Sequence, residues 1–170
     1  MEHVILVDEN DIEIGQMEKL RAHESGDLHR ALSVFLFNSK GELLLQQRAL
    51  AKYHSPGLWT NTCCSHPRPG EQSKDAAVRR LQEEMGMSCL IEKSFDFIYR
   101  AEFENGLVEH ELDHVFIGRS DDKPVINPVE VESWKYISKE NLVADIHNNP
   151  DHYTVWFKIC LQRVLDNYFN

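Results

Sequence analysis

The chain has 170 residues, of which 42% are apolar and 27% are charged, the profile of one globular domain with a single core. Its formal net charge of −10 excludes a general binder of duplex nucleic acid, because phosphate backbones are bound by basic surfaces. An anionic small-molecule substrate would need a local basic patch that acts against the overall negative field.

The N-terminus begins with a predicted strand, residues 3–7, followed by acidic residues. It lacks the basic start and small-residue cleavage site of a signal peptide, and no apolar run in the chain approaches the ~20 residues of a membrane span. We therefore expect a cytoplasmic protein without a membrane partner. Residues 15–24 are typical of a short helix or an ordered arm.

Two strands joined by the turn "NSKG" are predicted next, at residues 32–37 and 42–49. Residues 53–70 contain three of the six prolines and two glycines, which predicts a long loop, and such loops are usually functional. A helix is predicted over residues 74–85, because apolar residues recur at helical spacing, Ser73 can cap it and Gly86 can end it.

The remaining chain is predicted to form strands at 94–101 and 107–118, an extended segment at 125–137, and helices at 138–147 and 153–168. Strands, a central helix, more strands and then helices indicate an α+β fold with a mixed sheet, not a doubly wound parallel sheet. We expect one domain that spans residues 1–170.

The segment "TNTCCSHP", residues 60–67, gathers reactive side chains in a turn-rich context. Adjacent cysteines such as Cys63 and Cys64 rarely bridge each other, and four cysteines in the chain do not indicate a disulfide scaffold. Cys64 and His66 have no second pair of ligands at zinc-knuckle spacing, so a zinc knuckle is not supported.

The predicted central helix carries a second motif. The stretch from Ser65 to Met87 resembles the Nudix box, G-x5-E-x7-R-E-U-x-E-E-x-G-U with U aliphatic, in which carboxylates gather on a divalent cation bound to a diphosphate. Two positions depart from it: Ser65 replaces the first glycine, and Arg80 replaces the first glutamate of "REU". A hydrolase usually needs that carboxylate to place metal and water, so we expect a diphosphate to be bound here without being cleaved.

These motifs, with "QRALAKYHSPGLW" (47–59) and "ENGLVEHE" (104–111), resemble the type 1 isopentenyl-diphosphate isomerases over about residues 19–156. The resemblance implies a Nudix-type mixed β-sheet core sandwiched by helices. It also implies interconversion of isopentenyl and dimethylallyl diphosphate, for isoprenoid biosynthesis, by protonation and deprotonation through a tertiary carbocation. No flavin is expected, the partner is the small isoprenoid diphosphate, and the oligomeric state, monomer or dimer, stays open.

The resemblance assigns the two proton-transfer roles to Cys64 and Glu111. It implies that Tyr99 lies beside Glu111 and that Trp156 lies near the isoprenoid end of the substrate. These residue types suit the chemistry, because the pKa of a thiol responds to its surroundings and an aromatic face can stabilise a cation. Ordinary packing is the alternative interpretation of Tyr99 and Trp156.

A divalent metal is implied near the paired glutamates. Glu109 and Glu111 are two apart in an extended run, so both project from one face, where their charges repel each other unless a cation joins them. The resemblance implies a metal held by three histidines and two glutamates: His23, His29, His66, Glu109 and Glu111. Such donors suit Mn²⁺ or Zn²⁺ better than Mg²⁺. The first two histidines come from an N-terminal arm, about residues 1–30.

A second ion, Mg²⁺ bridging the substrate phosphates, would be held by Glu84 and by the backbone carbonyl of Cys64. The diphosphate itself would be bound by four cations that match the family's basic positions: Lys19, Arg48, Lys52 and Arg80. For Arg80 a solvated salt bridge with Glu84, four residues along the helix, is the other interpretation. The remaining histidines are interpreted as bystanders: His3, His54, His110, His114, His147 and His152.

Two other functions fit parts of the pattern. The first is a Nudix hydrolase acting on a nucleoside or other diphosphate, against which Arg80 and Ser65 argue. The second is a non-catalytic module that binds a metal or a diphosphate, against which Cys64 and Tyr99 beside the metal ligands argue.

Overall fold

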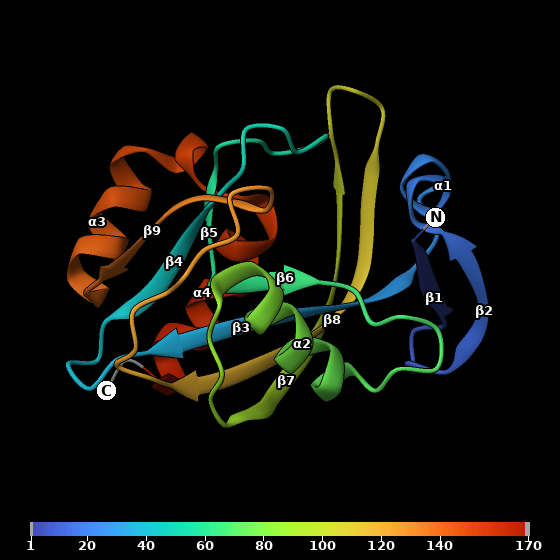
Figure 1. The fold of residues 1–170 in the computed structure, drawn as a ribbon. Coiled ribbons are helices and arrows are strands. Elements are labelled where there is room, and N and C mark those ends of the chain that lie inside the picture. Colours follow the sequence, from blue (N-terminus) through green and yellow to red (C-terminus); the bar gives the residue numbers. More distant parts are fainter. Residues whose placement is uncertain (1, 169–170) are drawn as a thin grey trace.

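The computed structural model describes residues 2–168 (Figure 1). The strands in this part of the chain are β1 (His3–Val7), β2 (Glu13–Glu18), β3 (His29–Phe37), β4 (Leu43–Arg48), β5 (Trp59–Thr60), β6 (Cys63–Ser65), β7 (Ile91–Glu102), β8 (Val108–Arg119) and β9 (Val131–Ile137). The helices are α1 (Lys19–Ser25), α2 (Ser73–Met85), α3 (Lys139–Asn148) and α4 (Val155–Tyr168), with a 3-10 turn η1 (Pro150–His152).

Strand β3 is the centre of the sheet. It pairs in parallel with β8, from His29 opposite Glu111 to Phe37 opposite Arg119, and antiparallel with β6. β7 and β8 form a long antiparallel hairpin that extends the sheet beyond β8. The near-continuous apolar sequence of β3 fits this position, because a strand buried on both faces has no solvent side on which to alternate polar residues.

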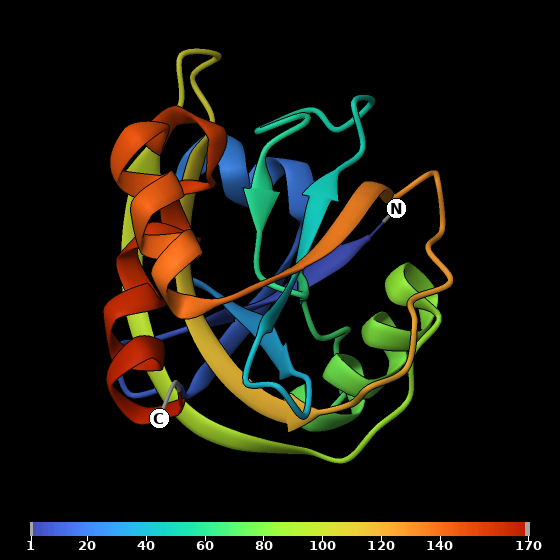
Figure 2. The ribbon, with the colours of Figure 1, turned by 90° about the vertical axis from the view of Figure 1, so that its left-hand side faces the viewer.

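Helices cover both faces of β3, and the period-2 alternation of a strand decides which side chain meets which helix. Leu32, Val34 and Leu36 pack in the core that includes residues of α2. Phe35 and Phe37 pack in the core that includes residues of α4. Figure 2 shows α2 on one side of the sheet and α3 and α4 on the other. This confirms the predicted α+β fold, a mixed sheet sandwiched by helices.

The predicted hairpin at residues 32–49 is only partly correct. Its turn forms, but the register of β3 with β4 contains the single pair Phe37 and Leu43. β4 then diverges and pairs with β9 and β5 instead (Figure 1). The divergence matters for function, because the pocket described below is lined by residues of both strands.

Two predictions about helix starts need correction. Residues 15–24 belong to two elements, since β2 continues to Glu18 and α1 begins at Lys19. The Glu18 carboxylate caps α1 by accepting hydrogen bonds from the N–H groups of Leu20 (3.3 Å) and Arg21 (3.2 Å). The prediction that Ser73 caps α2 was wrong, because Ser73 is already helical and the residue before it makes no side-chain capping bond.

Other boundaries are close to those predicted. Gly86 ends α2 in the left-handed conformation, with φ of 63°, as is common at helix C-termini. The predicted loop 53–70 contains the short strands β5 and β6, and only residues 131–137 of the extended segment 125–137 form a strand. Within residues 2–168, no helix is long and apolar enough to cross a membrane.

Candidate active site

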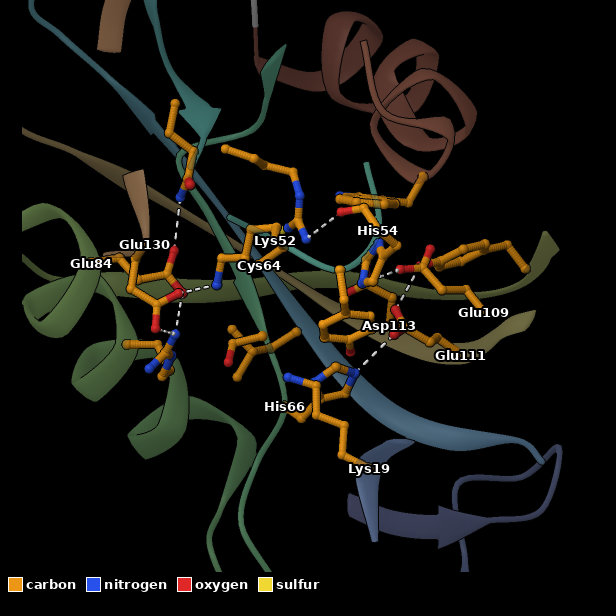
Figure 3. Close-up of a pocket in the computed structure, with 18 residues that line it drawn as sticks. Lys19, Lys52, His54, Cys64, His66, Glu84, Glu109, Glu111, Asp113 and Glu130 are labelled. Carbon is orange, nitrogen blue, oxygen red and sulfur yellow. Dashed lines mark hydrogen bonds and ion pairs between the residues drawn. The ribbon is translucent and has the colours of Figure 1, made fainter. Parts of the chain in front are cut away.

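One pocket is lined by residues of both diverging strands, of the neighbouring strands β6, β7 and β8, and of the helices α2 and α4 (Figure 3). Its wall includes most of the residues nominated from the sequence: Lys19, Arg48, Lys52, Cys64, His66, Arg80, Glu84, Tyr99, Glu109, Glu111 and Trp156. The other two nominated residues, His23 and His29, are fully buried, and their rings lie 5.9 and 5.1 Å from the ring of His66. Residues that are distant in the sequence thus meet in one place.

The sheet register explains how the acidic residues converge. Glu109, Glu111 and Asp113 alternate along β8, so all three project from one face of the strand. In the register, Glu111 is opposite His29 of β3 on one side and Tyr99 of β7 on the other. A parallel pair and an antiparallel pair therefore deliver a histidine and a tyrosine to the same carboxylate.

Two of the buried histidines have the tautomers that metal ligation requires. His23 Nδ1 lies 2.7 Å from the Lys19 carbonyl and His29 Nδ1 lies 2.8 Å from the Asp27 carbonyl. A carbonyl only accepts, so each Nδ1 carries a hydrogen, and in the neutral form of each ring the lone pair is on Nε2. Both Nε2 atoms are buried and have no hydrogen-bond partner among residues 2–168. Metal-binding histidines are typically oriented in this way by a second group.

Glu111 completes this cluster. Its Oε1 lies 2.8 Å from His66 Nε2 and 3.4 Å from His29 Nε2. One donor atom from each of His23, His29, His66 and Glu111 lies within 4.8 Å of all the others, and all four residues are buried. The donor chemistry and the unpartnered nitrogens both fit a divalent cation.

A second group of donors adjoins the first and shares one residue with it. It consists of His23, His54 and Glu109, again with donor atoms within 4.8 Å of one another. Glu109 therefore belongs to this second group and not to the four-residue cluster. The interpretation of His54 as a bystander was wrong in one respect, because its side chain is buried in the pocket wall.

The pKa values of the two glutamates are shifted in opposite directions. Burial works to raise the pKa of Glu111, but His66 and His29 hold that pKa well below its usual range. Burial and the neighbouring Glu111 raise the pKa of Glu109 well above its usual range. The Tyr99 hydroxyl lies 2.6 Å from Glu111 Oε2 and 3.1 Å from Glu109 Oε2, and burial next to both raises its own pKa. Tyr99 is therefore a hydrogen-bond donor held against an ionised Glu111.

The adjacent cysteines face opposite ways from β6. Cys63 is fully buried in the core that includes residues of α2, whereas the half-buried Cys64 lines the pocket. Burial raises the pKa of the Cys64 thiol to about 12, against the lowering influence of Arg48. Cys64 therefore keeps its proton at neutral pH, in the same pocket as the carboxylates of β8.

Two of the basic residues, Arg80 and Lys52, share an acidic partner. Arg80 Nη2 lies 2.6 Å from Glu84 Oε1 and 3.3 Å from Glu130 Oε1. Lys52 forms a salt bridge with the same Glu130 (Figure 3). The salt bridge between Arg80 and Glu84 that was one interpretation of the sequence thus forms, but in the pocket wall.

Arg48 and Lys19 complete the basic set. Arg48 donates to the His54 carbonyl at 3.2 Å, and its guanidinium carbon lies 5.3 Å from the centre of the Trp156 ring. Lys19 pairs with Glu2 at 3.1 Å. Each of these cations borders the pocket, as a patch for an anionic group requires.

The Nudix-like stretch forms the predicted loop and helix. Arg79 donates two hydrogen bonds to Glu71, at 2.7 and 2.8 Å, which ties the loop before α2 to the body of that helix. Glu84 is buried, accepts from Gln46 Nε2 at 2.8 Å and lines the pocket. Its position suits a carboxylate ligand, although Arg80 and Gln46 now occupy both of its oxygens.

Several residues of the pocket wall were not nominated from the sequence, among them His54, Asp113 and Glu130. Of the three, Asp113 is the one that the sequence pattern could have indicated, because it continues the alternation of Glu109 and Glu111. His54 and Glu130 lie outside regular alternation, and only the path of their loops brings them to the pocket. The other histidines interpreted as bystanders are not among the residues that line it.

Comparison with known proteins identifies the family. The model of the NUDIX domain matches residues 27–157. Isopentenyl-diphosphate Delta-isomerase 1 of Aromatoleum aromaticum is 55% identical over 96% of this chain and 93% of its own length. Isopentenyl-diphosphate Delta-isomerase of Pectobacterium atrosepticum is 53% identical over 96% of this chain and 91% of its own length.

Solved structures agree on the fold. A crystal structure of a Deinococcus radiodurans protein superposes with a TM-score of 0.78 at 22% identity, covering 95% of this chain and 98% of that one. The NUDIX domain of Shewanella oneidensis NrtR superposes with a TM-score of 0.62 at 16% identity, covering 82% and 86%. The chain therefore belongs to the Nudix domain family and, within it, to the isopentenyl-diphosphate Delta-isomerases.

Proposed function

We propose that this protein is a type 1 isopentenyl-diphosphate Delta-isomerase, which interconverts isopentenyl and dimethylallyl diphosphate for isoprenoid biosynthesis. The observation that carries the proposal is the content of the pocket. A thiol, Cys64, and a carboxylate, Glu111, line it together, with cations for a diphosphate on the same wall. A membrane partner or a nucleic-acid partner has no part in this chemistry.

The reaction needs one proton given and one proton taken. Protonation of the terminal carbon of the alkene gives a tertiary carbocation, and loss of a proton from the neighbouring methylene gives the isomer. We infer that Cys64 and Glu111 are the two proton carriers, and that they exchange roles when the reaction runs backwards. Tyr99 donates to Glu111 at 2.6 Å and so orients that carboxylate.

The carbocation requires a dry, electron-rich surround. Trp156 is buried in the pocket wall, and its aromatic face is proposed to stabilise the cation. The diphosphate is proposed to bind to Lys19, Arg48, Lys52 and Arg80. Since Arg48 already lies over Trp156, one residue of the diphosphate set also adjoins the proposed isoprenoid end.

A divalent cation fits beside Glu111. We propose that His23, His29, His66, Glu109 and Glu111 hold it, and that Mn²⁺ or Zn²⁺ suits these nitrogen and oxygen donors better than Mg²⁺. Such an ion supplies positive charge that favours an ionised Glu111 in a buried place. A Mg²⁺ ion that arrives with the diphosphate would be held by Glu84 and the Cys64 carbonyl.

Two wider expectations accompany this function. We propose that the whole chain acts as one Nudix-like domain, with an N-terminal arm, about residues 1–30, that supplies His23 and His29. We also propose a cytoplasmic location, because all four cysteines are free thiols, as a reducing compartment maintains them.

The test is a product assay with isopentenyl diphosphate, Mn²⁺ and Mg²⁺. We expect dimethylallyl diphosphate to accumulate to a constant ratio with its isomer, and no inorganic phosphate to be released. Release of phosphate without formation of the isomer would instead support the hydrolase, the function against which Arg80 argues.

A further inference from the structure

His54 occupies an unusual position for a residue that the motifs leave without a role. It lies in the loop between β4 and β5, and its side chain is buried. Its ring is stacked on that of His23 at 5.9 Å and meets Trp156 edge-on at the same distance. Figure 3 shows it near Glu109 at the wall of the pocket.

Within residues 2–168, neither ring nitrogen of His54 makes an ordinary hydrogen bond with a side chain. Its Nε2 lies 3.4 Å from Glu109 Oε1, longer than a typical hydrogen bond, and its Nδ1 is buried without a partner among residues 2–168. A buried polar group without a partner is costly, so most such groups have one. A nearby cation would give the imidazole a strong partner.

His23 links this residue to the metal cluster. Its Nδ1 is committed to the Lys19 carbonyl, so its unpartnered Nε2 is the atom available to both donor groups. The first group adds His29, His66 and Glu111, and the second adds His54 and Glu109. His23 is thus the residue that the two groups share, and an ion beside its Nε2 would border both. Because the groups are separate sets at 4.8 Å, ligation by all six residues requires His54 and Glu109 to move toward that ion.

We propose that His54 is a further ligand of the metal ion, so that four imidazoles and two carboxylates surround it. This inference rests on the metal site of the proposed function and adds a histidine to it. Because each donor is a buried nitrogen or oxygen, the expected ion is a divalent transition metal such as Zn²⁺ or Mn²⁺.

The added ligand would couple the metal to the diphosphate site. His54 closely follows Arg48 and Lys52 in the sequence, and the Arg48 side chain donates to the His54 carbonyl. Attachment of His54 to the ion would therefore restrain the backbone that carries two of the proposed diphosphate-binding cations. We expect added Zn²⁺ to slow amide hydrogen exchange at residues 52–57.

The test is to observe the imidazole ring nitrogens by NMR on the full chain, labelled with ¹⁵N-histidine, before and after addition of one equivalent of Zn²⁺. The proposal predicts that the ring signals of four histidines move, and that His54→Gln removes one of these four. Movement of only three, with the His54 signals in place, would overturn it. Since no substrate is present, this result stands apart from the outcome of the isomerase assay.

The Zn²⁺ affinity of a His54 variant distinguishes a His54 that binds the ion from one that only lies near it. His54→Gln keeps a group that can hydrogen-bond Glu109 but removes the imidazole. We expect its Zn²⁺ dissociation constant, from competition with a chelator, to rise at least about tenfold, with His147→Gln at an exposed position of α3 as the unchanged control. An unchanged constant in a His54→Gln protein whose metal-free unfolding curve matches the parent would contradict ligation.

Discussion

At the scale of single residues, Cys63 and Cys64 have the same type of side chain but lie in different surroundings. Their alternation along β6 buries one beside α2 and turns the other toward the pocket that holds the carboxylates of β8. Desolvation raises the pKa of both thiols, although Cys64 is only half-buried. Position, and not acidity, therefore separates the proposed catalytic residue from its neighbour.

Replacing each cysteine should separate chemistry from packing. We expect Cys64→Ala to lose isomerisation by at least about 10³-fold while its unfolding free energy stays near that of the parent, because a proton carrier is removed. Cys63→Ala should keep most activity but lose roughly 1 kcal/mol of stability, because a small buried group leaves a cavity. Steady-state kinetics measures the activity of each variant, and chemical denaturation measures its stability. Equal inactivity of the two variants would refute the assignment.

Glu130 supplies a second test at this scale. It pairs with both Lys52 and Arg80, so a diphosphate that binds these residues as proposed would have to replace it. Glu130→Gln should bind inorganic diphosphate with Mg²⁺ about fivefold more tightly, since ion pairs of this kind are worth ~1 kcal/mol. Calorimetric titration measures this, with exposed Glu132→Gln as the control. Weaker binding would instead make Glu130 a part of the binding site.

At the scale of elements, the sequence motifs predicted the residues of the pocket better than the sequence predicted the pairing of the strands. The residues of "TNTCCSHP", the Nudix-like stretch and the β8 glutamates were nominated from sequence, and the family and fold predictions are confirmed. The roles of the individual residues remain predictions. The divergence of β4 from β3 was not predictable, because a turn sequence specifies a reversal of the chain and not how far the strands stay paired.

His54 and Glu130 show the same limit. His54 was interpreted as a bystander because isolated histidines are usually on the surface, and nothing local indicates that its side chain lies in the pocket wall. Glu130 lies just before β9, and its role depends on the pairing of β9 with β4. Both depend on contacts between distant segments, which a single sequence does not reveal.

Substitution of Gly86 at the C-terminal end of α2 tests whether this position requires glycine. A Cβ on Gly86 would lie 2.5 Å from the Val125 carbonyl oxygen, while a Cβ on Gly41 would meet no atom within 4 Å. Both glycines have positive φ, 63° and 76°, so alanine strains both backbones by roughly 1–2 kcal/mol. The unfolding free energy of Gly86→Ala, measured by chemical denaturation, should therefore fall by about 1–3 kcal/mol more than that of Gly41→Ala, because the new Cβ overlaps the Val125 carbonyl. Equal losses would show that the contact with Val125 yields freely.

At the scale of the whole molecule, the proposed metal would join segments far apart in the chain. His23 lies in α1, His29 begins β3, His66 follows β6 and Glu111 lies in β8. An ion that binds the folded protein and not the unfolded chain stabilises it by mass action. The metal site is therefore expected to contribute to the stability of the whole fold as well as to the proposed chemistry.

Removing the metal should thus lower the melting temperature. We expect Zn²⁺ at about 100 times its dissociation constant to add about 2.7 kcal/mol to the unfolding free energy of the parent, and chelation to reverse this. His66→Ala should lose most of that metal-dependent gain, while His147→Gln keeps it. Calorimetric scans with and without the ion would contradict the site if the parent melts at the same temperature in both.

Cys64 and Glu111 are proposed to move protons at the alkene of a C5 diphosphate. The decisive experiment is to incubate the protein with isopentenyl diphosphate, Mn²⁺ and Mg²⁺ in D₂O and to follow the products by NMR. We expect deuterium in a methyl group of dimethylallyl diphosphate with the parent protein, and no incorporation with Cys64→Ala. Incorporation by Cys64→Ala at the parental rate, or product without deuterium from the parent, would contradict it.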